Sequence, residues 1–376
     1  MEHYLDNAAT TRVCDEAAEA AVRAMTVTYG NPSSTHASGR NARALLDSSR
    51  KRIASALGCG QSELVFTSCG TESDNWAVIA GTESMRRKGL HVISSEAEHD
   101  AVRKSLDELE RRGFEITRLK PDPSGSVSID SLRSALRPDT VLVSLMLVNN
   151  ETGSVTDISA AARAIKDAGS SALLHTDAVQ AFLKVPFRAA SLGADLISIS
   201  GHKIHAPKGI GALYIRKGLR LKPYIIGGGQ EDGRRAGTEA LPQIAAFAAA
   251  CDAAAAQFEE YSQRMYGFRD EIIRSVSSSV PSVTINGGGA PHILNISLPG
   301  LKSEVLMNYL EAREIYVSKS SACKKGGRSH VLEAMGVDPR SIDGSIRIGL
   351  SRYTTGEDVT ALCEGIREAW KSLAHS

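Results

Sequence analysis

The stretch ISISGHKIHAPKGIG, residues 197–211, decides the fold. A short apolar run ends in a serine, a glycine and a histidine, Lys203 follows, and glycines return at positions 209 and 211. This pattern predicts a strand with a lysine just beyond its carboxyl end. Such a lysine is a nucleophile toward carbonyl groups when an apolar pocket or nearby cations lower its pKa. The alternative is a solvated lysine in a surface loop.

The sequence on either side of this stretch alternates between apolar runs and helical patterns. The apolar runs are predicted strands and lie at residues 64–67, 91–95, 115–119, 141–148, 172–177, 195–200 and 211–216. Helical patterns cover residues 15–25, 41–57 and 157–168, and others begin at residues 72 and 100 and after residue 130. Strands this apolar, separated by helices, predict an α/β fold with a mostly parallel sheet buried on both faces.

The pattern of apolar and polar residues changes after a long, alanine-rich helical stretch at residues 242–274. We expect a bend in this stretch near residues 265–267. Short alternating strands and interleaved helices follow and predict a smaller α+β domain. We therefore expect a large domain at residues 15–260, and a small domain built from residues 1–14 and 261–376.

Composition limits the possible partners. The net charge of the 376 residues is +1, which gives no support for binding of nucleic acid or of an anionic membrane surface. The first residues show no signal sequence, and no apolar run reaches the roughly 18 to 20 residues that span a bilayer. The six cysteines form no CxxC pair, which argues against a disulfide framework and against a structural zinc site. We expect a soluble, cytoplasmic protein without a metal.

Polar residues follow most of the predicted strands. In an open parallel sheet, ligands bind beyond the carboxyl ends of the strands, so these residues are candidates for a site. Each has a plainer interpretation as a helix cap, a structural residue or a solvated side chain. The candidates are Gly70 and Thr71, His99, Asn150, Asp177 and Gln180, Ser200 and His202, with Thr238 in a later glycine-rich segment.

Two candidates lie in the predicted small domain. Cys323 sits among serines, glycines, Lys319, Lys324, Lys325 and Arg328, and such positive surroundings favour a thiolate over a thiol. An ordinary loop cysteine is the alternative. Arg347 lies in a predicted short strand, where its guanidinium either binds a substrate carboxylate in bidentate fashion or forms a weak surface ion pair.

Ten short motifs, in order, resemble the cysteine desulfurases, which are class V pyridoxal-phosphate enzymes of fold type I. The resemblance spans essentially the whole chain, and the sequence around Cys323 resembles the long-loop subgroup of iron-sulfur and nitrogen-fixation type. The motifs are LDNAATT, GNPSSTHASGR, TSCGTES, AEHDAV, NNETG, HTDAVQ, SGHKIHAPKGIG, GGGQEDGRRAGTE, SSAC and SIRIGLSRYTT.

The resemblance implies pyridoxal 5'-phosphate as the cofactor. Lys203 would bind it covalently and later move the α-proton, and His99 would stack on its ring and assist proton transfer. Asp177 would pair with the pyridine nitrogen, where a carboxylate keeps that nitrogen protonated. The resemblance assigns the remaining contacts to Gln180 at the ring oxygen, to Asn150 against cofactor and substrate, and to Gly70, Thr71, Ser200, His202 and Thr238 of a neighbouring subunit at the phosphate.

The resemblance also implies the chemistry at the substrate. Arg347 would bind the carboxylate of L-cysteine, and Cys323 would take its sulfur as a persulfide and release L-alanine. The protein would then be a homodimer that hands sulfur to an acceptor protein, such as an iron-sulfur scaffold or a tRNA-thiolation protein. The alternatives are a selenocysteine lyase, another class V enzyme such as a transaminase, or an inactive binding partner in iron-sulfur assembly.

The chain departs from the family at three places. Cys69 stands where relatives have glycine or another small residue, and Asp232 where a basic or polar residue is more common. Residues 324–329 read KKGGRS, where many relatives have serine, alanine or glycine. We assign no role to Cys69, and the added charge at 324–329 is a candidate for tuning the thiolate or the choice of acceptor.

Overall fold

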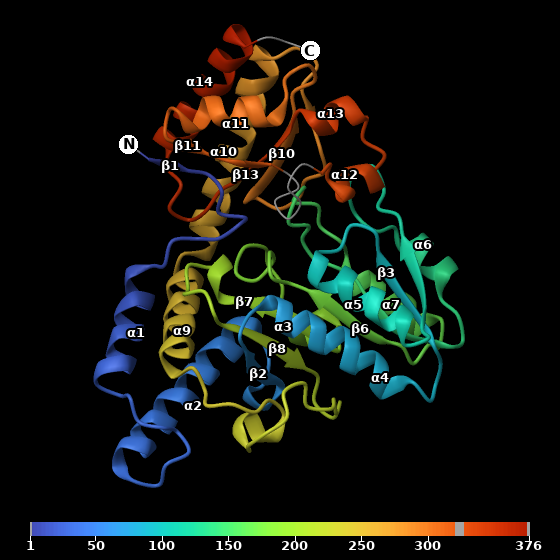
Figure 1. Ribbon diagram of the computed structural model, residues 1–376, viewed down its shortest axis with the longest axis vertical. Helices are drawn as coiled ribbons and strands as arrows, with labels where there is room; N and C mark the ends of the chain where they lie inside the picture. The colour runs from blue at the N-terminus through green and yellow to red at the C-terminus, as the bar shows by residue number, and fades with distance from the viewer. Residues whose placement is uncertain (1, 320–326, 374–376) are drawn as a thin grey trace.

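A mixed sheet of seven strands forms the centre of the molecule (Figure 1). The computed structural model describes residues 2–319 and 327–373. Strand β8 is antiparallel to both of its neighbours, and every other neighbouring pair is parallel, which confirms the predicted α/β class and the seven strands. In spatial order the strands are β2 (Leu64–Thr67), β8 (Gly211–Ile215), β7 (Leu196–Ser200), β6 (Leu173–Asp177), β5 (Thr140–Ser144), β3 (His91–Ser95) and β4 (Glu115–Leu119).

Helices cover the faces of this sheet. They are α1 (Asp15–Thr26), α2 (Ala37–Leu57), α3 (Gly70–Asn75), α4 (Gly81–Met85), α5 (Asp100–Arg111), α6 (Ile129–Ala135), α7 (Ile158–Asp167), α8 (Ala189–Leu192) and α9 (Leu241–Ala256), with a π-helical turn at Trp76–Ala80. Helix α9 packs against both α1 and α2 (Figure 1). It is rich in buried alanine, as this close packing requires, yet no helix in the described parts of the chain is long and apolar enough to cross a membrane.

A second, smaller group of elements lies at the top of Figure 1. Its four-stranded sheet has the order β12-β13-β10-β9, and β1 pairs with β11 in parallel. The strands are β1 (His3–Tyr4), β9 (Thr284–Ile285), β10 (Ile293–Ser297), β11 (Ile315–Tyr316), β12 (Ser318–Lys319) and β13 (Ser345–Gly349). The helices are α10 (Phe258–Ser279), α11 (Ser303–Glu311), α12 (His330–Ala334), α13 (Pro339–Asp343) and α14 (Gly356–Ser372). The predicted division into two domains at residue 260 stays a prediction.

Two local predictions were wrong. The strand expected over residues 141–148 ends at Ser144. Beyond it, the backbone N–H groups of Leu145 and Leu147 still donate to β6, at His175 and Asp177, but the N–H of Met146 donates to the side-chain carboxyl of Glu98, which lies past the end of β3. The bend expected near residues 265–267 is absent, since α10 continues through them. The break lies at Gln257, whose φ of −125° leaves the helical region.

Candidate functional site

The carboxyl ends of five strands meet at one edge of the large sheet. Strands β2, β3, β5, β6 and β7 point the same way, because β8 is antiparallel to both β2 and β7 and the other neighbours are parallel. The residues that follow these strands therefore gather at this edge. They include Gly70 and Thr71 after β2, His99 after β3, Asn150 after β5, Asp177 and Gln180 at the end of β6, and Ser200, His202 and Lys203 at the end of β7.

Lys203 closes a single 3-10 turn that directly follows β7. Its Nζ atom donates hydrogen bonds to the carbonyl oxygens of Ala8, at 2.6 Å, and Ala9, at 2.7 Å. The first residue of the turn, Gly201, has no space for a side chain, since a Cβ atom there would lie 2.8 Å from Cγ2 of Ile210. The turn therefore sets the direction in which Lys203 leaves the sheet.

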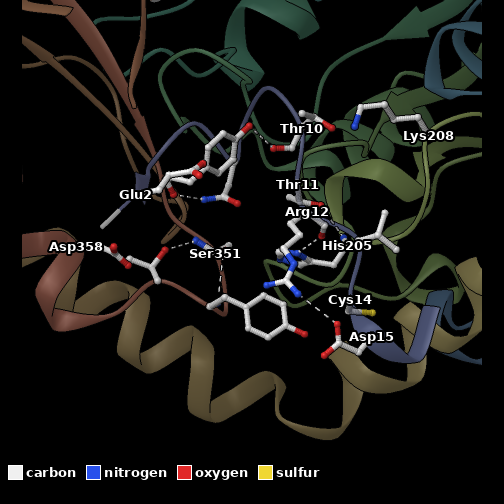
Figure 2. Close-up of a pocket in the computed structure, with 15 residues that line it drawn as sticks. Glu2, Thr10, Thr11, Arg12, Cys14, Asp15, His205, Lys208, Ser351 and Asp358 are labelled. Carbon is white, nitrogen blue, oxygen red and sulfur yellow. Dashed lines mark hydrogen bonds and ion pairs between the residues drawn. The ribbon is translucent and has the colours of Figure 1, made fainter. Parts of the chain in front are cut away.

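The N-terminal segment holds this turn in place. The Thr11 hydroxyl donates to the carbonyl oxygen of His202 at 2.9 Å and accepts from the backbone N–H of His205 at 2.8 Å. The Cys14 N–H donates to the carbonyl oxygen of His205 at 2.9 Å. Figure 2 shows Thr11, Cys14 and His205 side by side along this contact. The position of Lys203 therefore depends on residues nearly two hundred positions away in the sequence.

Asp177 and His99 form the charged centre of the edge. Asp177 is 4% exposed, and one of its carboxylate oxygens accepts a hydrogen bond from the N–H of Val179 at 2.8 Å. Burial and the nearby Asp74 carboxyl raise the pKa of Asp177 to about 7, and the charge of His99 acts in the opposite direction. His99 caps α5, since its Nδ1 accepts from the N–H of Ala101 at 3.1 Å.

A buried polar network behind Asp177 was missed by the sequence reasoning. His175 lies two residues before Asp177 on β6, between the hydroxyl oxygens of Ser144 at 2.8 Å and Ser198 at 3.0 Å. Its Nε2 atom lies 3.6 Å from the Asp74 carboxylate. Burial raises the pKa of Asp74 to about 7 and lowers that of His175 to about 4. The sequence did hold a signal for this network, because His175 is two residues before Asp177 and therefore lies on the same face of the strand.

Two of the predicted residues have a side-chain oxygen atom that is buried and unpaired. Oε1 of Gln180 and Oγ of Ser200 are buried and have no hydrogen-bond partner in the described chain, whereas Nε2 of Gln180 donates to Ala8 at 2.8 Å. His202 lies beside them, with Nδ1 3.1 Å from the Thr10 hydroxyl. Burial, with Lys203 nearby, lowers the pKa of His202 to about 4, so its ring is neutral at neutral pH. Unpaired buried oxygens of this kind are costly unless a ligand binds them.

Arg347 reaches the same edge from β13. It is 3% exposed, so the weak surface ion pair considered above is excluded. Its guanidinium donates to the carbonyl oxygen of Asn150 at 2.9 Å, to Asp6 at 3.0 Å and to the Ser318 hydroxyl at 2.8 Å. Its Nε atom is buried and has no partner among the described residues. Arg347 therefore links the two groups of elements at the edge.

Cys323 lies outside the described residues. Two of the four cations expected to support its thiolate are described, and both are paired with carboxylates: Lys319 with Glu304 at 3.2 Å and Arg328 with Asp343 at 2.8 Å. Ser329, which follows this stretch, caps α12 and bonds to the buried Glu151 carboxyl.

Thr238 is exposed. No hydrogen bond or ion pair within residues 2–319 and 327–373 joins it to them. Its segment is held by two ion pairs: Arg50 with Glu231 at 2.6 Å, and Arg235 with Glu72 at 2.9 Å.

An open cavity of about 610 Å³ lies on the far side of the N-terminal segment (Figure 2). It is lined by the segment itself, by His205 and Lys208, and by residues 351–358 near the start of α14. None of the predicted site residues in the described chain lines it. The cavity is therefore separate from the sheet edge that carries Lys203.

The sequence and the fold are similar to those of known proteins. Residues 3–362 match the family aminotransferase class-V. The chain is 41% identical to cysteine desulfurase IscS of Methanosarcina thermophila over 98% of this chain and 92% of that protein. Among solved structures, a NifS-like protein matches 99% of this chain and 100% of its own, at 36% identity and a TM-score of 0.94. A structure described as SspA in complex with cysteine matches 94% and 100%, at 31% identity and a TM-score of 0.81.

Proposed function

The chain belongs to the class V aminotransferase family and is a cysteine desulfurase, and we propose that Lys203 and Cys323 carry its reaction. The observation that supports this site is the sheet edge, where the Lys203 turn, the buried Asp177 and His99 come together. The overall reaction is balanced: L-cysteine and the thiol of Cys323 give L-alanine and a persulfide on Cys323.

The residues at the sheet edge fit pyridoxal 5'-phosphate, the cofactor we propose. The buried hydroxyl of Ser200, which has no partner in the described chain, can donate a hydrogen bond to a phosphate oxygen. The Gln180 amide can donate to the ring oxygen only through Nε2, in place of its bond to Ala8. Position 70 has no space for a side chain, since a Cβ atom there would lie 2.7 Å from Cγ2 of Val179. The glycine therefore leaves its backbone uncovered by a side chain. When bound, the cofactor acts as an electron sink for the bonds at the substrate's α-carbon.

The protein residues then have separate tasks. Lys203 takes and returns the proton at the α-carbon, since its amine lies just beyond the carboxyl end of β7 and can act as a general base. Asp177 would pair with the pyridine nitrogen of the bound cofactor and keep that nitrogen protonated, and the positive charge there would favour the ionised carboxylate. Arg347 orients L-cysteine through the carboxylate, for which a guanidinium offers two parallel hydrogen bonds.

Sulfur leaves through Cys323. The Cys323 thiolate attacks the sulfur of L-cysteine, the S–Cβ bond breaks, and its electron pair stays with the carbon, which takes up a proton. The structure of SspA with cysteine, at 31% identity, supports the choice of substrate. An acceptor protein, such as an iron-sulfur scaffold or a tRNA-thiolation protein, would then take the sulfur. We place this transfer in the cytoplasm, where thiols stay reduced, and the described cysteines are free thiols.

The proposed active form is a homodimer. Thr238 is exposed and has no hydrogen bond to the other predicted site residues within residues 2–319 and 327–373, yet its segment is fixed by two ion pairs. A fixed, exposed hydroxyl of this kind is suited to complete the phosphate site of a second copy. The dimer would then be required for tight cofactor binding.

The function is tested with one pair of variants. Lys203→Ala should lose the visible absorbance of the bound cofactor and the release of alanine from L-cysteine, whereas Lys208→Ala, an exposed lysine five positions later, should keep both. A Lys203→Ala protein that stays as yellow and as active as wild type would contradict the assignment. If Cys323→Ala keeps full activity on selenocysteine but loses its activity on L-cysteine, the result would favour the selenocysteine lyase.

A further inference from the structure

A small cavity lies beside Lys203, which is one of the residues that line it. Its volume is about 20 Å³, which is enough for one water-sized or monatomic occupant. Cavities of this size exclude sulfate, phosphate and the cofactor itself. The titratable residues that line the cavity are Lys184, Lys203, His205, Tyr261, His292 and Arg352.

Three of the lining side chains have buried polar atoms without a partner. Nζ of Lys184 makes no hydrogen bond in the described chain, although this residue is only 7% exposed. Both ring nitrogens of His292, which is 0% exposed, also lack a hydrogen bond of normal geometry, although the Gln180 backbone lies close enough to raise its pKa. Nε and Nη1 of Arg352 are buried and unpaired in the same way. Each unmet group of this kind costs stability.

The unpaired atoms are almost all hydrogen-bond donors. An ammonium group and a guanidinium group donate and never accept, and a neutral imidazole adds one more donor. A water molecule accepts only two hydrogen bonds, whereas a halide ion accepts from every donor around it. The lining contains no aspartate or glutamate. An anion therefore satisfies this set of groups better than a water molecule does.

The local charge points to the same conclusion. Burial lowers the pKa of Lys184 to about 7, and the positive charges of Lys203 and Arg347 lower it further in the same direction. The nearby Asp6 carboxylate is already bound to Arg347 at 3.0 Å. The titratable and charged groups that face Lys184 are His202, Lys203, His205, Tyr261, His292, Arg347 and Arg352. Those that are charged, Lys203, Arg347 and Arg352, are all cations, and an anion would offset their repulsion.

We infer that the cavity between Lys184, His292 and Arg352 is a binding site for a small monovalent anion of the halide type. The site shares Lys203 with the cofactor contacts proposed above, but none of its other lining residues is among those contacts, and it is too small for a phosphate group. An anion bound there places a negative charge beside the lysine that carries the reaction. The net charge around Lys203 would thus depend on the halide concentration.

Bromide is the probe, because its anomalous X-ray scattering identifies it without ambiguity. Crystals of the purified protein, grown with bromide in place of chloride, should show one anomalous peak between Lys184 and His292. Crystals of Lys184→Met should lack the peak, and those of Lys208→Met, which removes an exposed lysine outside the cavity, should keep it. A wild-type cavity that holds only a water molecule at saturating bromide would overturn the inference, as would a peak that survives in Lys184→Met.

A solution measurement covers the case in which Lys184→Met fails to fold. Wild-type protein should gain thermal stability from bromide beyond the gain from sulfate at equal ionic strength, because sulfate does not fit. If the charged form of Lys184 binds the anion, bromide affinity should weaken about tenfold between pH 6 and pH 8. Equal effects of the two salts, or an affinity independent of pH, would contradict the inference.

Discussion

Nζ of Lys203 lies 2.6 Å from the carbonyl oxygen of Ala8, a residue 195 positions earlier in the chain. The same carbonyl oxygen accepts a hydrogen bond from Nε2 of Gln180 at 2.8 Å. One backbone atom of the N-terminal segment thus contacts two of the residues proposed to hold the cofactor. The segment is therefore part of the site and fixes where Lys203 rests.

Thr11→Val should loosen this contact. The Thr11 hydroxyl donates to the carbonyl oxygen of His202 and accepts from the N–H of His205. A valine of similar shape would leave both of these backbone groups without their hydrogen bond. We expect the free energy of unfolding to fall by about 1 to 3 kcal/mol in denaturant titrations. Thr26→Val, an exposed threonine bonded only within its own helix, should change it by less than about 0.5 kcal/mol. Equal effects of the two changes would contradict the role of Thr11.

Arg50→Ala and Arg52→Ala form a matched pair on α2. Arg50 pairs with Glu231, whose side chain is 2% exposed, at 2.6 Å, whereas Arg52 pairs with the exposed Asp252 at 2.7 Å. Loss of one partner of a buried pair leaves a buried charge, so Arg50→Ala should cost about 3 kcal/mol of unfolding free energy and Arg52→Ala less than about 1 kcal/mol. Because Glu231 fixes the segment of Thr238, only Arg50→Ala should also release the cofactor on gel filtration. Retention of the cofactor by both variants would argue against the proposed part of this segment in the phosphate site.

Asp74 should destabilise the protein as the pH rises. Burial raises its pKa to about 7, whereas an unfolded aspartate titrates near about 3.9. The folded form therefore holds a proton that the unfolded form has lost, and stability falls as the pH rises between these values. The advantage of Asp74→Asn over wild type should grow by about 1 to 3 kcal/mol from pH 5 to pH 8. As a control, the difference in unfolding free energy between wild type and the exposed Asp130→Asn should stay constant over this pH range. A constant difference for Asp74→Asn as well would contradict the role of Asp74.

Arg347 should govern the use of the substrate. Arg347→Lys keeps a charge but loses the planar pair of donors, so we expect kcat/KM for L-cysteine to fall about 10- to 100-fold with the cofactor absorbance unchanged. Asp6→Asn removes the ion pair but leaves the guanidinium in place, so kcat/KM for L-cysteine should fall by less than about tenfold. An unchanged kcat/KM in Arg347→Lys would exclude Arg347 as the carboxylate partner.

The parts of the fold that depend on local pattern were predictable from the sequence. The apolar runs located all seven strands of the large sheet, and the rule for strand ends located Asp177 and Lys203 at one edge. The resemblance added roles that no pattern could supply, such as those of His99 and Arg347.

Long-range contacts were beyond prediction. Nothing in the spacing of Ala8 indicates that its carbonyl oxygen accepts from Lys203, because backbone groups carry no sequence signal of their own. The Asp6 partner of Arg347 and the Asp74 neighbour of His175 likewise come from distant segments. The end of β5 at Ser144 was missed because residues 145–148 stay apolar, although the N–H of Met146 donates to the Glu98 side chain and not to a strand.

The most direct test of the central claim is mass spectrometry of the purified protein after brief exposure to L-cysteine. The account predicts one added sulfur atom on Cys323, removable by reductant, together with an equal amount of alanine. It also predicts that Lys203→Ala shows neither product. Alanine formation at the wild-type rate with no sulfur on Cys323, or with Cys323 replaced by alanine, would contradict it.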